Sequence, residues 1–188
     1  MEKQKKNKRG SVALFGTLKV MVAVSLLCAM SVILGKYLAI NVGEVLRFSF
    51  ENMTIILAGI MFGPVIGLVA GVAADLIGCL LVGYAVNPII TAGAAAIGFL
   101  SGLLYMLLSK TTLPYAVKIL MPVFVSHLVG SVLIKSIGLS AFYDMPLAIL
   151  MLWRGLNYLI IGAAEYTLIY FIVKNKAINS QFERLKRG

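Results

Sequence analysis

Apolar residues fill almost the whole chain between two polar ends. From Asn52 to Ser109 the sequence contains one charged residue, Asp75. A helix needs roughly 20 apolar residues to cross a bilayer, so this stretch is too long for two spans. Glycine and proline at residues 62–64 and 83–88 divide it into three. The full pattern predicts six membrane-spanning helices, at residues 17–37, 51–67, 68–84, 88–109, 116–137 and 147–174.

The composition agrees with a chain embedded in lipid. Of the 188 residues, 61% are apolar and 13% are charged. An apolar side chain left in water costs about 1.5–3 kcal/mol, so we expect a bilayer to cover this surface. We predict an all-α integral membrane protein, in which six transmembrane helices form a compact bundle. The membrane domain then covers residues 17–174, between basic tails at 1–16 and 175–188.

The formal charge of +10 is concentrated at the two ends. Cytoplasmic segments of membrane proteins are enriched in lysine and arginine, and an even number of crossings places both ends on one side. We therefore predict that both termini are cytoplasmic and that the charge does not indicate binding to nucleic acid. We expect the tails to be partly disordered. The opposite face is then built from the connections at 37–50, 83–88 and 136–146.

The first apolar run, from Val20 to Gly35, has an alternative interpretation as a cleaved signal peptide. It lacks a convincing small-residue cleavage site, and the later segments are equally apolar. A retained helix therefore fits better. Cys28 and Cys79 both lie inside apolar stretches, where cysteine behaves as a small hydrophobe. We expect neither a disulfide nor a metal site.

Charged residues inside a span are costly and are candidates for function. Arg154 and Glu165 are eleven residues apart, which returns them to nearly one face of the last helix. Asn157, Tyr158 and Ile161 lie between them on the same face, so we predict an inward polar stripe. Arg154 either contacts a ligand or anchors the helix, whereas Glu165 lies deeper and is a structural residue or a partner for a cationic group.

Two further polar residues interrupt apolar spans. Asp75 lies among small residues that permit close helix packing. A buried carboxylate has to be paired, hydrogen-bonded or protonated, and we favour a structural role over a proton relay. His127 has no Cys, Asp or Glu nearby in the sequence, so we interpret it as a hydrogen-bonded packing residue, with ligand binding as an alternative.

Cations and aromatic residues gather around the face predicted to lie outside. They are Lys36, Arg47, Lys135 and Arg154, with Tyr37, Phe48, Phe50, Tyr84, Tyr143 and Trp153. Such a set suits an anionic ligand with a flat ring, because the cations hold carboxylates and the aromatic faces stack on the ring. An aromatic belt with snorkelling cations explains the same residues equally well.

Familiar catalytic patterns are absent from the sequence. It contains no GxxxxGK[ST] phosphate loop, no GxSxG and no HExxH. We expect no enzyme activity and no cofactor. If the chain takes part in active uptake, then a partner or an ion gradient supplies the energy.

Four sequence segments carry a family resemblance. They are LRFSFE at residues 46–51, LAGIMFGP at 57–64, ADLIG at 74–78 and NPIIT at 87–91. In this order and at these distances they resemble the folate-specific group of the substrate-binding S components of energy-coupling-factor (ECF) vitamin transporters. The resemblance covers residues 20–110 well and the remainder by pattern only.

The resemblance implies a six-helix S component in the bacterial plasma membrane with both ends cytoplasmic. It also implies partners, namely a transmembrane coupling subunit and two ATPase subunits. Family members dock to the coupling subunit through a small-residue motif of the AxxxA type on the first helix. The matching positions here are Ser25 and Ala29, and serine at the first of them is still small enough for close approach.

The implied substrate is folate. We expect its carboxylates at Arg47, Arg154 and Lys135, its polar edges at Asn87 and Asn157, and ring stacking at Tyr84 and Trp153. Only the Arg47 and Asn87 positions fall inside the matching segments. Three alternatives stay open: another vitamin such as riboflavin or thiamine, an autonomous proton-coupled carrier that uses Asp75, His127 and Glu165, and a structural membrane subunit that binds no ligand.

Overall fold

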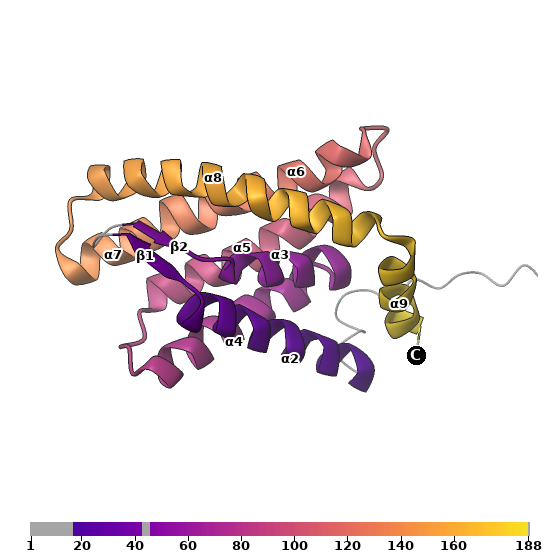
Figure 1. Cartoon of the computed structure of the whole chain (residues 1–188), viewed down its shortest axis with the longest axis horizontal. Coiled ribbons are helices and arrows are strands. Elements are labelled where there is room, and N and C mark those ends of the chain that lie inside the picture. Colours follow the sequence, from indigo (N-terminus) through magenta and orange to yellow (C-terminus); the bar gives the residue numbers. More distant parts are fainter. Residues whose placement is uncertain (1–16, 43–45, 188) are drawn as a thin grey trace, which may run out of the picture.

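Helices running along one long axis make up most of the protein (Figure 1). The computed structural model describes residues 17–42 and 46–187. Its elements, with η marking π-helix, are α2 (Leu18–Val32), η1 (Ile33–Tyr37), β1 (Ile40–Val42), β2 (Leu46–Phe48), α3 (Glu51–Phe62), α4 (Pro64–Val82), α5 (Pro88–Leu108), α6 (Tyr115–Ser126), η2 (His127–Ile134), α7 (Lys135–Tyr143), α8 (Leu147–Lys174) and α9 (Lys176–Arg187).

Five helical segments of the described chain are long and apolar enough to cross a membrane. They are Leu18–Tyr37, Pro64–Val82, Pro88–Leu108, Tyr115–Tyr143 and Leu147–Lys174. The class of helical membrane protein is thus confirmed. The predicted second span, 51–67, corresponds to the shorter α3, which is buried along most of its length. Whether the chain crosses the bilayer six times therefore stays a prediction.

The boundary between α3 and α4 lies at Gly63 and not after residue 67. Gly63 has φ +97°, a backbone conformation that residues other than glycine rarely adopt. Pro64 then occupies the first turn of α4, where its missing N–H costs no helical hydrogen bond. The predicted third span, 68–84, consequently begins four residues too late.

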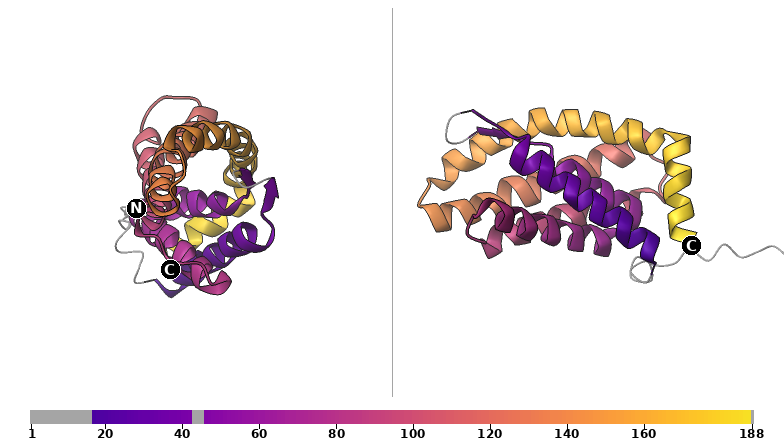
Figure 2. Two further views of the ribbon diagram at one scale, coloured as in Figure 1. Left: turned by 90° about the vertical axis from the view of Figure 1, so that its left-hand side faces the viewer. Right: turned by 60° about the horizontal axis from the view of Figure 1, so that its bottom comes forward.

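The connections between helices gather at the two ends of the bundle (Figures 1 and 2). The β1–β2 hairpin lies at one end, which we call the hairpin end, together with the α4–α5 and α7–α8 connections. The start of α2 and the whole of α9 lie at the other, which we call the terminal end. The described chain therefore begins and ends at the same end, as an even number of crossings requires. Which end faces the cytoplasm stays a prediction.

Two stretches predicted as connections contain regular structure. Within 37–50, β1 and β2 pair antiparallel, with Asn41 opposite Arg47. Within 136–146, the helix that begins at Tyr115 continues to Tyr143, and residues 136–145 contain no proline that would end it. The connection to α8 is only Asp144–Pro146, and Asp144 has φ +51°.

The predicted C-terminal tail also differs from expectation. Residues 176–187 form α9, which turns across the terminal end of the bundle (Figure 1). Its apolar residues recur at helical spacing, and Phe182 packs edge-on against Phe62 with ring centroids 5.5 Å apart. This amphipathic pattern orders a segment that its charge alone suggests is disordered. The N-terminal tail, 1–16, lies outside the described residues.

Small residues let α4 and α5 approach closely. A Cβ atom at Gly98 would collide with the carbonyl oxygen of Gly67, and one at Gly71 would collide with the carbonyl of Ala94. Helices in lipid associate through such contacts because the bilayer provides little hydrophobic drive between them. The α4–α5 pair is thus a rigid wall of the bundle.

Candidate functional site

A cavity of about 230 Å3 opens among the elements of the hairpin end. Its walls come from η1, α3, α4, α5, α7, α8 and the hairpin and α4–α5 connections. The charged residues that line it are Lys36, Glu51, Asp75, Lys135 and Arg154, and the aromatic ones are Tyr84, Tyr143 and Tyr158. In the described part of the chain, the cavity therefore combines three cations, two carboxylates and several flat rings.

Glycines on neighbouring helices support two of the lysine side chains. A Cβ atom at Gly78 would lie 2.7 Å from Cε of Lys36, and a Cβ atom at Gly93 would lie 2.6 Å from Cγ of Lys135. A larger residue at either position would displace the lysine stem. The apolar stems of these lysines therefore run over bare backbone, which leaves the ammonium groups at the cavity.

Lys135 is the most buried cation of the cavity, with 5% of its surface exposed. Its Nζ lies 3.4 Å from Oε1 of Glu51. Glu51 is the first residue of α3, where the helix dipole favours a negative charge. This ion pair joins α3 to α7 and offsets part of the cost of burying both charges.

Arg154 is held by a neighbouring helical segment and by an aromatic ring of its own helix. Its Nε donates to the carbonyl oxygen of Ser131 at 2.9 Å, and its guanidinium lies 5.6 Å from the ring centroid of Tyr158. Ser131 belongs to η2, and π-helical segments are frequent at functional sites. The hydrogen bond and the cation–π contact together fix the direction of the guanidinium beside the cavity.

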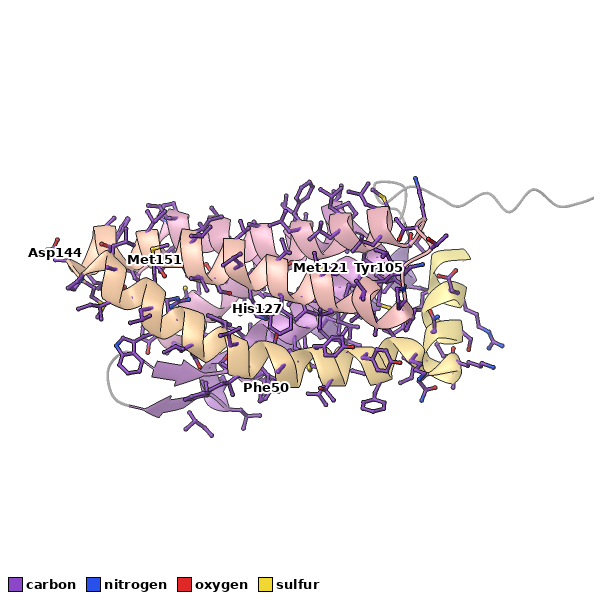
Figure 3. The ribbon with its side chains drawn as sticks, turned by 90° about the horizontal axis from the view of Figure 1, so that it is seen from above. Phe50, Tyr105, Met121, His127, Asp144 and Met151 are labelled. Atoms are coloured by element: carbon purple, nitrogen blue, oxygen red, sulfur yellow. The ribbon has the colours of Figure 1, made fainter. Side chains whose placement is uncertain are left out.

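A buried polar network continues from Tyr158 toward the bundle centre. Asn52 Nδ2 lies 3.5 Å from the Tyr158 hydroxyl and 3.4 Å from the Ser131 hydroxyl. Ser131 Oγ in turn lies 3.3 Å from Nδ1 of His127, whose Nε2 lies 2.6 Å from Glu165 Oε2. Figure 3 shows His127 in the interior, about midway along the bundle. The network thus links the cavity wall to a fully buried carboxylate.

The predicted inward stripe on α8 is confirmed. Arg154, Asn157 and Tyr158 line the cavity, and Ile161 and Glu165 are buried. The interpretation of His127 as a hydrogen-bonded packing residue is also confirmed, since it is 2% exposed and contacts Glu165. What the sequence did not reveal is that these two residues are partners.

Five of the seven predicted ligand contacts line the cavity. Those that line it are Arg154, Lys135, Asn87, Asn157 and Tyr84. Trp153 is not among its lining residues, and 42% of its surface is exposed on α8. Arg47 lies on β2 at the hairpin end, but its side chain is outside the described part of the structure. Their contacts with a ligand stay predictions.

Asn87 has a structural role in addition to its place at the cavity. Its Oδ1 accepts from the backbone N–H groups of Ile89 and Ile90, which caps the start of α5. Its Nδ2 donates to the carbonyl of Gly138 at 3.0 Å. Both ends of the amide therefore already bond to protein, and Asn87 ties α5 to α7.

Three charged residues that line the cavity are not among the predicted ligand contacts, namely Lys36, Glu51 and Asp75. The sequence predicts Lys36 only as a cation near this face and favours a structural role for Asp75. The signal that could have identified all three is their position as charges inside or at the end of an apolar helix. Asp75 does accept a hydrogen bond, from the Thr91 hydroxyl at 2.7 Å.

The proton-relay alternative required Asp75, His127 and Glu165 to act together. His127 and Glu165 are in contact, whereas the hydrogen-bond partner of Asp75 is Thr91. The contacts of the described residues therefore favour two separate groups over one continuous relay.

A second, apolar cavity of about 380 Å3 lies between α2 and α4 on the outside of the bundle. Ser25 and Ala29, the two positions of the predicted docking motif, are exposed and line it. Beneath them Cys28 Sγ lies 3.5 Å from the carbonyl oxygen of Ala70. The motif thus faces a groove that another helix can enter.

Comparisons with known proteins agree with one another. A family model described as "ECF transporter, substrate-specific component" matches residues 19–174. Three solved structures share the fold. FolT bound with folic acid has a TM-score of 0.68 and 22% identity, over 89% of this chain and 96% of the other. An S component for biotin has a TM-score of 0.66 and 19% identity, over 88% and 96% of the two chains, and an S component of a bacterial ECF transporter has a TM-score of 0.59 and 18% identity, over 81% and 94%. No curated protein sequence matches the chain significantly.

Proposed function

The chain belongs to the family of substrate-specific components of ECF transporters, and we propose that it captures folate at the outer face of the plasma membrane. The observation that carries this proposal is the cavity at the hairpin end, where Lys135 and Arg154 meet the rings of Tyr84 and Tyr158. Guanidinium and ammonium groups bind carboxylates, and aromatic rings pack against a flat heterocycle. The fold shared with FolT bound with folic acid agrees with this choice.

Folate fits the charge of the cavity better than a vitamin without negative charge does. Among the lining residues that the structure describes, three cations accompany two carboxylates, and Glu51 is already engaged by Lys135. The glutamate part of folate adds two negative charges, which Arg154 and Lys36 can bind. Riboflavin and thiamine carry no such tail, so the excess of cations has no role in binding them.

Delivery to the cytoplasm requires partners. We infer that a transmembrane coupling subunit docks in the groove at Ser25 and Ala29, where small side chains permit close helix contact. Two ATPase subunits then supply the nucleotide chemistry that the sequence of this chain lacks. The hairpin end is the outer face in this arrangement, and the basic ends lie in the cytoplasm.

We expect the purified chain to carry or to bind folate. Mass spectrometry of small molecules extracted from the detergent-purified protein should detect a folate, and added folate should raise the Tm of the folate-free protein. Riboflavin and thiamine are the matched controls and should leave the Tm unchanged. Finding neither extracted folate nor a thermal shift would remove folate as the substrate, while family membership would stand.

We expect uptake only in the presence of the ATPase partners. Proteoliposomes that contain this chain alone should accumulate no folate, with or without a proton gradient. Addition of a coupling subunit, both ATPases and ATP should give concentrative uptake. Accumulation by the chain alone that collapses with the proton gradient would instead support the autonomous carrier.

A further inference from the structure

The two carboxylates of the cavity have different surroundings. Glu51 lies 3.4 Å from Lys135. Asp75 has no lysine or arginine nitrogen within 4.0 Å among the side chains that the structure describes. The Thr91 hydroxyl donates to its Oδ2 at 2.7 Å, a shorter contact than the 3.2 Å between that hydroxyl and the carbonyl of Asn87. Thr91 therefore orients the carboxylate, but no ion pair in the described chain compensates its charge.

The tie to Thr91 is not required to hold the helices together. Asp75 is on α4 and Thr91 on α5, and these two helices already approach through the backbone contacts of Gly67, Gly71 and Gly98. A carboxylate in a membrane helix is costly, so an apolar residue would serve packing alone at lower cost. Its position at the cavity indicates a role toward the ligand.

We propose that Asp75 forms a subsite that accepts two adjacent N–H groups from the flat ring of the ligand. This inference rests on the proposed function and assigns the pterin end of folate to α4. A carboxylate accepts two parallel hydrogen bonds from a planar pair of N–H donors, as it does from arginine. The pterin ring presents such a pair, a ring nitrogen beside an exocyclic amino group. The bound ring then satisfies the acceptor oxygens of Asp75.

Asp75 and Arg154 line the same cavity from two different helices. Asp75 is on α4 and Arg154 is on α8, and these helices lie on opposite sides of the bundle (Figures 1 and 2). Lys36 Nζ lies 5.5 Å from the ring centroid of Tyr84, and both residues line this cavity. The cavity thus offers a carboxylate without an ion pair on α4 and the guanidinium of Arg154 on α8, which orients a donor-rich ring toward Asp75 and an anionic tail toward Arg154.

The test compares three probes on the purified full-length chain and on Asp75→Asn. Folate has both ends, 6-hydroxymethylpterin has only the ring, and p-aminobenzoylglutamate has only the anionic tail. Asparagine has the same shape as aspartate and keeps one oxygen as an acceptor, but an NH2 donor replaces the other oxygen. We expect the Kd for folate and for 6-hydroxymethylpterin to rise by about 10- to 100-fold. The Kd for p-aminobenzoylglutamate should stay within about 2-fold of its value for the unmodified protein, because this probe has no pterin ring and makes no contact with residue 75.

Several outcomes would overturn the subsite. They are an equal loss for all three probes, an unchanged Kd for folate, and an unmodified protein that does not bind 6-hydroxymethylpterin. An unmodified protein that binds the pterin but not folate would reject the proposed substrate and keep the subsite. If Asp75→Asn does not fold, Thr91→Val takes its place, because it keeps the carboxylate and removes the hydrogen bond that orients it. This variant should raise the Kd for 6-hydroxymethylpterin by about 2- to 10-fold and leave the Kd for p-aminobenzoylglutamate unchanged.

Discussion

Replacing Glu165 by alanine is expected to lower the stability of the bundle by about 3–5 kcal/mol, the usual cost of removing one member of a buried pair. Glu165 is fully buried, and its Oε2 lies 2.6 Å from Nε2 of His127. The variant leaves His127 without this partner in a region that water cannot reach. In a chain of this size the loss corresponds to a fall in Tm of about 6–20 °C, measured by thermal unfolding in detergent.

A double variant separates the pair from simple packing. His127→Phe keeps a ring against Tyr158, on which His127 stacks with centroids 4.8 Å apart. Combined with Glu165→Leu, it replaces both polar partners by apolar groups of similar size. We expect this double variant to be more stable than either single one, because a buried pair can be exchanged for apolar groups at little cost. Strictly additive losses would show that the two residues are not coupled.

The course of the helices is the part of the fold that the sequence predicts best. The start of α5 at Pro88 and the course of α8 from Leu147 to Lys174 follow directly from apolar runs bounded by proline or by charge. Two boundaries failed where local chemistry was more subtle. At Gly63 the end of α3 depends on a positive φ, and at residues 136–143 a helix continues through a polar-looking stretch because nothing stops it.

Pairing across helices is what the sequence could not supply. His127 and Glu165 are 38 residues apart, and Lys135 and Glu51 are 84 apart. Periodicity predicts which face of one helix turns inward, and the stripe from Arg154 to Glu165 was found in this way. It does not predict which neighbouring helix packs against that face, so these two pairs are visible only in the structure.

Replacing Arg154 by alanine is expected to raise the Kd for folate by about 10- to 150-fold, which corresponds to about 1.5–3 kcal/mol for a lost hydrogen bond to a charged group. Nε of Arg154 is held by the carbonyl of Ser131 and its guanidinium by Tyr158, so the side chain is oriented before the ligand arrives. Arg154→Lys should recover only part of the affinity, because an ammonium group cannot reproduce a planar two-point contact. Calorimetric or fluorescence titration of the purified chain measures both variants.

Arg184 provides the matched control for this change. It is an exposed arginine on α9 at the terminal end, so Arg184→Ala removes the same charge far from the cavity and should leave the Kd unchanged. Among ligands, 6-hydroxymethylpterin lacks the carboxylates and should bind Arg154→Ala and the unmodified protein nearly equally. A loss of the same size for 6-hydroxymethylpterin would mean that Arg154 shapes the cavity and does not bind the anionic tail. The comparison works because the arginine and the pterin ring are assigned to opposite walls, so a defect confined to one wall affects only one end of folate.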